Sequence, residues 1–78
     1  MNDQDRFMVA YENALSEDMA KHPERYGRTS LHIVVERMRV AFEQGSYNQS
    51  SPAVRGACKA VGIKPTRTAI NAFWGNGQ

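Results

Sequence analysis

The chain has 78 residues, of which 41% are hydrophobic and 23% charged, and its formal net charge is +2. That length supports one small domain around one core, and that composition is typical of a globular protein, so a separate cofactor domain and a disordered chain are both excluded. No apolar run approaches the roughly 18 residues of a membrane span, and the acidic, polar start is unlike a secretory signal.

The first predicted element is a helix from about Asp3 to Lys21. Asn2 or Asp3 can cap its start, and acidic residues in the first turn suit the positive end of the helix dipole. Pro23 ends the helix because the residue before a proline resists helical backbone angles, and a turn follows at Gly27. Apolar residues recur at helical spacing on one face, namely Phe7, Met8, Tyr11, Ala14, Leu15 and Met19.

The second predicted helix has its cap at 29–30 and ends at Gln44, with Gly45 in the left-handed closing position. Ile33 and Val40 lie nearly opposite its core face. These two residues either touch neighbours on the second side of a central helix or form an exposed apolar stripe for a partner or a second copy. The core face itself consists of Leu31, Val34, Val35, Met38, Ala41 and Phe42.

Two shorter helices follow a polar loop. Ser51 as cap and Pro52 at the first helical position predict the third helix, which runs to about Val61. Gly62 ends that helix, and a short turn leads to a fourth helix over about 66–74.

The sequence therefore predicts an all-α fold, a small four-helix domain that occupies residues 1–78. It divides into an acidic N-terminal helix (about 3–21), a basic helical part (about 30–74) and a frayed tail (75–78). Residues 1–24 carry six acidic and two basic side chains, whereas the rest carries two acidic and eight basic ones. Such a domain is electrostatically two-sided, unless the acidic helix packs over the basic part and neutralises it.

The segment 51–74 is typical of a helix-turn-helix-like hairpin, with a glycine-containing turn and small residues where the helices cross. Its second helix would then read bases: Arg67 suits guanine, Thr68 a thymine methyl group and Asn71 adenine. The other interpretation is a structural helix pair with a solvated basic face. The candidates for phosphate contacts are Arg55, Lys59 and Lys64.

The sequence contains no recognisable arrangement of catalytic residues. We therefore expect that the protein is not an enzyme and needs no cofactor. His22 and His32 are the only imidazoles, no serine–histidine–acid set is recognisable, and His32 with Glu36 makes only two potential metal ligands. Cys58, the only cysteine, lies among inward-facing residues, where a buried inert thiol is expected. We therefore predict no metal site, and a lone cysteine suits a reducing cytoplasm.

The alternative to DNA binding is a protein-binding module, such as an inhibitor of a host enzyme or defence complex. It depends on the charge polarity, on the apolar stripe of Ile33 and Val40, and on aromatic residues near exposed ends. The same stripe could also join two copies in a homodimer. Tyrosine and tryptophan are common anchors of protein interfaces. The aromatic candidates are Tyr26, Tyr47 and Trp74.

The chain also resembles small, uncharacterised proteins of tailed bacteriophages and prophages over roughly residues 31–74. The resemblance implies a setting in the cytoplasm of a bacterial host and a binding role, directed at double-stranded DNA or at a host protein. It implies no chemistry for any residue. It is carried by Glu36-Arg37-Met38, Ala41-Phe42, Gly45-Ser46-Tyr47-Asn48, Pro52-Ala53-Val54-Arg55, Cys58-Lys59-Ala60-Val61-Gly62-Ile63-Lys64 and Thr68-Ala69-Ile70-Asn71-Ala72-Phe73.

Overall fold

The computed structural model describes residues 2–75, which form four α-helices and one short 3₁₀ turn. The α-helices are α1 (Asp3–Lys21), α2 (Leu31–Gln44), α3 (Pro52–Val61) and α4 (Arg67–Trp74), and the 3₁₀ turn is η1 (Pro23–Arg25). The predicted all-α, four-helix fold is confirmed. The predicted frayed tail, apart from Gly75, lies outside the described residues.

The helix boundaries are set by local signals in the sequence. The Asn2 side chain accepts a hydrogen bond from the Asp5 amide at 2.8 Å, and the Thr66 hydroxyl accepts one from the Ala69 amide at 3.2 Å. Gly45 and Gly62 close α2 and α3 with φ of 74° and 80°, a conformation that strains any residue with a Cβ. Side-chain caps thus begin α1 and α4 and glycines end α2 and α3. Ser30 and Ser51 stand at the starts of α2 and α3, but their side chains make no capping hydrogen bond.

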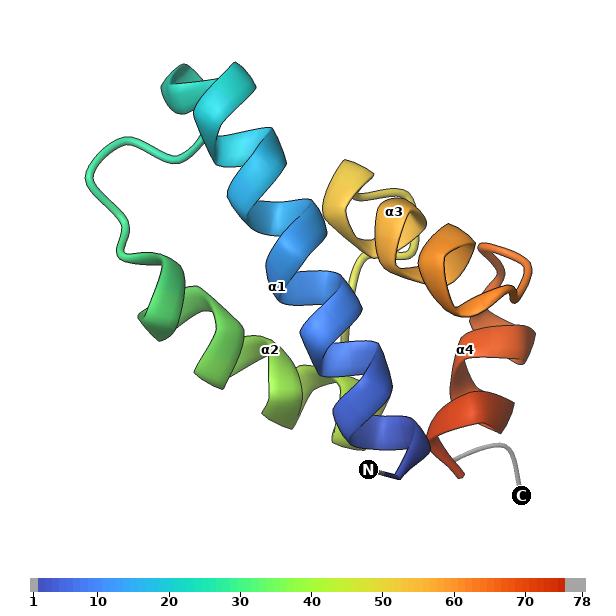
Figure 1. The fold of residues 1–78 in the computed structure, drawn as a ribbon. Coiled ribbons are helices and arrows are strands. Elements are labelled where there is room, and N and C mark those ends of the chain that lie inside the picture. Colours follow the sequence, from blue (N-terminus) through green and yellow to red (C-terminus); the bar gives the residue numbers. More distant parts are fainter. Residues whose placement is uncertain (1, 76–78) are drawn as a thin grey trace.

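Helix α1 is the central element of the domain. It contacts α2 on one side and α3 and α4 on the other, and Figure 1 shows it crossing between them. Its buried face carries Phe7, Tyr11 and Leu15, which are at most 3% exposed. The acidic helix is therefore the scaffold on which the basic part of the chain is assembled.

The core is an aromatic cluster centred on Phe42 at the C-terminal end of α2. The Phe42 ring lies 4.9 Å from the Phe7 ring and 5.4 Å from the Tyr11 ring, both edge to face, and stacks on Trp74 at 5.5 Å. Tyr47 completes the cluster, with its ring 5.1 Å from that of Phe42. Aromatic groups from α1, α2, α4 and the loop after α2 thus meet at one point.

Helices α1 and α3 approach closely through small residues. Gly56 of α3 lies so near Ala14 of α1 that a Cβ added to the glycine would sit 2.9 Å from the Ala14 Cβ. Ala53 and Ala57 are buried on the same side of α3. The close approach of the two helices therefore uses Gly56, and Ala60 of α3 is exposed.

Helix α2 is packed less completely than the others. Phe42 is its one buried side chain, while Leu31, Val34, Val35 and Met38 are only half-buried. In Figure 1 its N-terminal end lies farther from α1 than its C-terminal end does. Its opposite side carries Ile33 and Val40, which are 47% and 51% exposed. The exposed apolar stripe is therefore present, and the interpretation of α2 as a helix covered on both sides is wrong.

Candidate nucleic-acid interface

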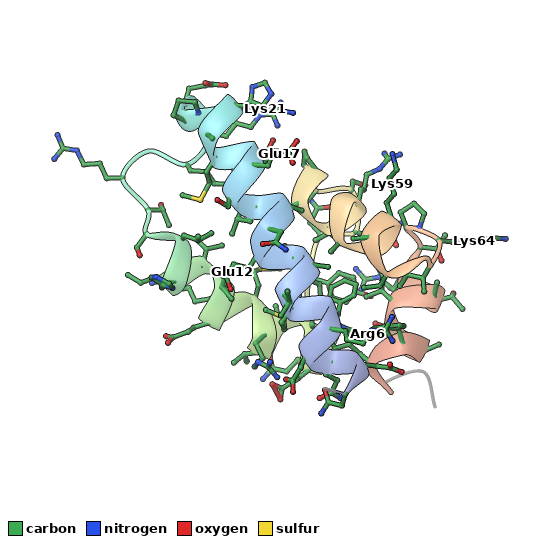
Figure 2. The ribbon with its side chains drawn as sticks, in the orientation of Figure 1. Arg6, Glu12, Glu17, Lys21, Lys59 and Lys64 are labelled. Carbon is green, nitrogen blue, oxygen red and sulfur yellow. The ribbon has the colours of Figure 1, made fainter. Side chains whose placement is uncertain are left out.

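Arg55, Lys59 and Lys64 form an exposed basic surface on α3 and the turn that follows it. Arg55 and Lys59 are one turn apart, on the side of α3 opposite the buried Ala53 and Ala57. In Figure 2 Lys59 and Lys64 project outwards from α3 and from the turn. Among residues 2–75 none of the three basic side chains makes an ion pair or a side-chain hydrogen bond, so their charges face solvent.

Four of the five acidic side chains of α1 pair with basic residues outside this surface. Because α1 packs against the opposite, small-residue side of α3, it leaves the basic surface uncovered. Helix α1 thus neutralises two bases that follow it in the chain, Arg25 and Arg39, and leaves the basic surface charged. The α1 pairs are Asp3–Arg6 at 3.0 Å, Asp5–Arg39 at 2.9 Å, Glu17–Lys21 at 2.7 Å and Asp18–Arg25 at 3.2 Å.

A shallow groove of about 420 Å³ lies beside the basic surface. Arg55 and Lys59 line it together with Gly56, and its apolar lining comes from Ile63 and Pro65 of the turn. No signal in the sequence assigns Ile63 and Pro65 to a site, because a turn residue carries no helical periodicity that would indicate which way it faces. The groove combines positive charge with an apolar floor.

Two of the three base-reading candidates are engaged within the domain. Arg67 donates hydrogen bonds to the carbonyl oxygens of Gly45 and Tyr47, the latter at 3.0 Å, and its guanidinium lies 4.9 Å from the centre of the Tyr47 ring. Asn71 Oδ1 accepts a hydrogen bond from the Tyr47 hydroxyl at 2.7 Å. Thr68 is exposed. Helix α4 thus uses Arg67 and Asn71 to fasten the loop after α2.

We expect Arg67→Ala to lower the free energy of unfolding by about 1.5–3 kcal/mol, because two charge-assisted hydrogen bonds and a cation–π contact are lost. Urea denaturation followed by circular dichroism measures the change. Thr68→Ala, on the exposed face of the same helix, is the matched control and should change stability by less than about 0.5 kcal/mol. Equal effects of the two substitutions would contradict the fastening role of Arg67.

Two of the aromatic interface candidates are buried, so the expectation that they lie near exposed ends is wrong. Tyr47 is 6% exposed and Trp74 is 2% exposed, because both pack on Phe42. Tyr26 is half-buried and donates a hydrogen bond to Asp18, which also pairs with Arg25. Burial and the neighbouring Asp18 charge raise the pKa of Tyr26 to about 12, so its hydroxyl stays protonated.

The other groups considered in the sequence are the Cys58 thiol and the potential metal ligands. Burial raises the pKa of the Cys58 thiol, whose residue is 0% exposed, as expected for an inert core cysteine. Within residues 2–75 no group of three or more histidine, cysteine, aspartate or glutamate side chains is placed to hold a metal ion. The arrangement that stands out is therefore the basic surface and its groove.

Comparisons with protein-family models, with curated proteins and with solved structures found no match to this chain. In the described part of the chain, no helix combines the length and the apolar character needed to cross a bilayer.

Proposed function

We propose that this protein binds double-stranded DNA through contacts of Arg55, Lys59 and Lys64 with the phosphate backbone. The observation that carries the proposal is that these three basic side chains are exposed and have no acidic partner among residues 2–75. An unpaired cationic surface binds DNA because each phosphate that it neutralises releases counterions that were condensed on the DNA. From the resemblance to phage proteins, the expected setting is the cytoplasm of a bacterial host.

Binding of this kind is expected to have little sequence preference. Arg67 and Asn71 would have to give up their contacts with the loop after α2 before they could reach base edges. Thr68 remains as an exposed candidate for a base contact, and one hydroxyl and methyl group discriminate weakly. Phosphate contacts fix position without reading sequence, so the proposed role is that of a DNA-backbone binder. The expected crossing of the last two helices does not support base reading either, because α3 and α4 each pack on α1 rather than on each other.

The test is fluorescence anisotropy of a labelled random-sequence duplex at about 50 mM and about 200 mM salt. Three phosphate contacts predict a slope near −2.7 in the logarithmic plot of affinity against salt, a value of about −0.9 for each contact. The triple substitution of Arg55, Lys59 and Lys64 by alanine should abolish binding at both salt concentrations.

The matched control for this test is a variant that loses one positive charge outside the basic surface. Arg28 is exposed in the segment before α2, so Arg28→Ala and Lys59→Ala lower the net charge equally. Lys59→Ala should make the slope shallower by about 0.9, whereas Arg28→Ala should leave it unchanged. Equal effects of the two variants, or no binding by the parent protein at the lower salt concentration, would reject the proposal.

The alternative function, inhibition of a host protein, keeps part of its support. Burial of Tyr47 and Trp74 removes two of its three aromatic anchors, while the exposed stripe of Ile33 and Val40 favours some protein contact. If the protein fails to bind the duplex and instead captures one host protein at high salt, the alternative replaces DNA binding.

A further inference from the structure

The outer face of α2, which consists of Ile33, Glu36, Arg37 and Val40, is independent of the basic surface. Ile33 and Val40 are seven residues apart, so they lie two helical turns apart on one line along the helix. They are 47% and 51% exposed, on the side of the helix opposite the buried Phe42. Glu36 and Arg37 flank this line, one on each side, and both are exposed.

The flanking charges have no partner within the domain. The described residues include no ion pair or side-chain hydrogen bond to Glu36 or Arg37, whereas Arg39 of α2 pairs with Asp5 of α1. The same arrangement continues one heptad later, where Glu43 follows on the flank of Glu36 and Gln44 on that of Arg37. The outer face thus has an apolar line, an acidic flank and a flank that donates hydrogen bonds.

This pattern complements itself in one orientation. If two copies of α2 pack in parallel about a twofold axis along the helices, the acidic flank of one copy meets the donor flank of the other. Glu36 then faces Arg37 of the second copy, and the reciprocal pair forms as well. An antiparallel pair would instead place Glu36 against Glu36 and Arg37 against Arg37, which is repulsive.

We propose that this protein forms a parallel homodimer through the outer face of α2, with Ile33 and Val40 in contact with the same residues of the second copy. Ile33 and Val40 are β-branched and recur at the seven-residue spacing of one core position of a two-stranded coil, and Glu36 and Arg37 stand between them. The other helices pack on the side of α2 that carries Phe42, so they leave the outer face accessible to the second copy. Dimerisation uses none of the residues of the basic surface. The dimer proposal can therefore be tested, and rejected, independently of the DNA-binding proposal.

Charge reversal tests the flanking pairs. Sedimentation equilibrium of the parent protein from about 1 µM to about 1 mM should show the mass rising to twice the monomer value. Glu36→Arg and Arg37→Glu should each hold the mass at the monomer value, because each places like charges on both flanks. An equimolar mixture of the two variants should restore the doubled mass, because the two basic flanks of the first variant then meet the two acidic flanks of the second.

The mixture also controls for misfolding, since a variant that fails to fold cannot restore the dimer. Arg28→Glu makes the same charge change as Arg37→Glu away from the outer face and should leave the dimer intact. A parent protein that stays monomeric at about 1 mM overturns the proposal, and so does a mixture that stays monomeric although circular dichroism shows both variants folded.

Orientation is tested by disulfide formation. In the parallel dimer, Ile33→Cys brings the two introduced thiols together at the interface, so mild oxidation should link the copies covalently. The parent protein controls for Cys58, which is fully buried and should not link copies. If instead Ile33→Cys links only to Val40→Cys in a mixture of the two variants, the copies are antiparallel and the proposal is wrong.

Discussion

Phe42→Ala should lower the free energy of unfolding by about 3–5 kcal/mol, the range found when a buried phenylalanine is truncated. The Phe42 ring contacts Phe7, Tyr11, Tyr47 and Trp74, so its removal leaves a cavity that borders three helices and a loop. A domain of this size is stable by only a few kcal/mol, so the variant is expected to be largely unfolded at room temperature.

Urea denaturation followed by circular dichroism measures this effect. Phe42→Leu keeps most of the volume and should retain a cooperative transition, with a loss of about 1.5 kcal/mol or less. Val9→Ala provides the surface control, because Val9 is 47% exposed, and it should change stability by less than about 0.5 kcal/mol. If Phe42→Ala were no more destabilising than Val9→Ala, the aromatic cluster would not be the centre of the core.

Gly56→Ala should destabilise the domain by about 1–3 kcal/mol, although alanine favours a helix over glycine by about 1 kcal/mol. The reason is the contact between α1 and α3, because the new methyl group would lie 2.9 Å from the Ala14 Cβ. Neither atom can rotate away, so the two helices must move apart. The expected sign is therefore opposite to the one that helix propensity predicts.

A double-mutant cycle isolates this contact. Ala14→Gly alone should cost about 1 kcal/mol through helix propensity, and combined with Gly56→Ala it should recover most of the stability that Gly56→Ala loses. Urea denaturation of the four proteins gives the coupling free energy. A stabilising effect of Gly56→Ala by itself would contradict the close approach of α1 and α3.

The helices of this domain were predictable because their ends are marked by residues with local conformational preferences. Pro52 after Ser51 starts α3, and Gly45 and Gly62 end α2 and α3 with left-handed backbone. The core face of α1 followed from helical spacing, because apolar residues at that spacing lie on one side of the helix and are buried together.

The candidate site was less predictable because it depends on contacts between distant parts of the chain. Tyr47 lies in a polar loop without periodicity, and its burial follows from the loop folding back on α4, where its hydroxyl bonds to Asn71. The same long-range contact engages Arg67, which the sequence alone presents as a free basic residue at a helix start. By contrast, Arg55 and Lys59 lie on a helix face that periodicity does define, and both are exposed as predicted.

The complete burial of Cys58 has a consequence for how motion in this domain can be measured. The thiol is 0% exposed in α3, so a thiol reagent can modify it only when the packing around α3 opens. Since the sequence contains one cysteine, the rate of modification counts those openings without interference from other sites. When closing is faster than labelling, the rate gives the free energy of opening directly, in native buffer and without any engineered probe.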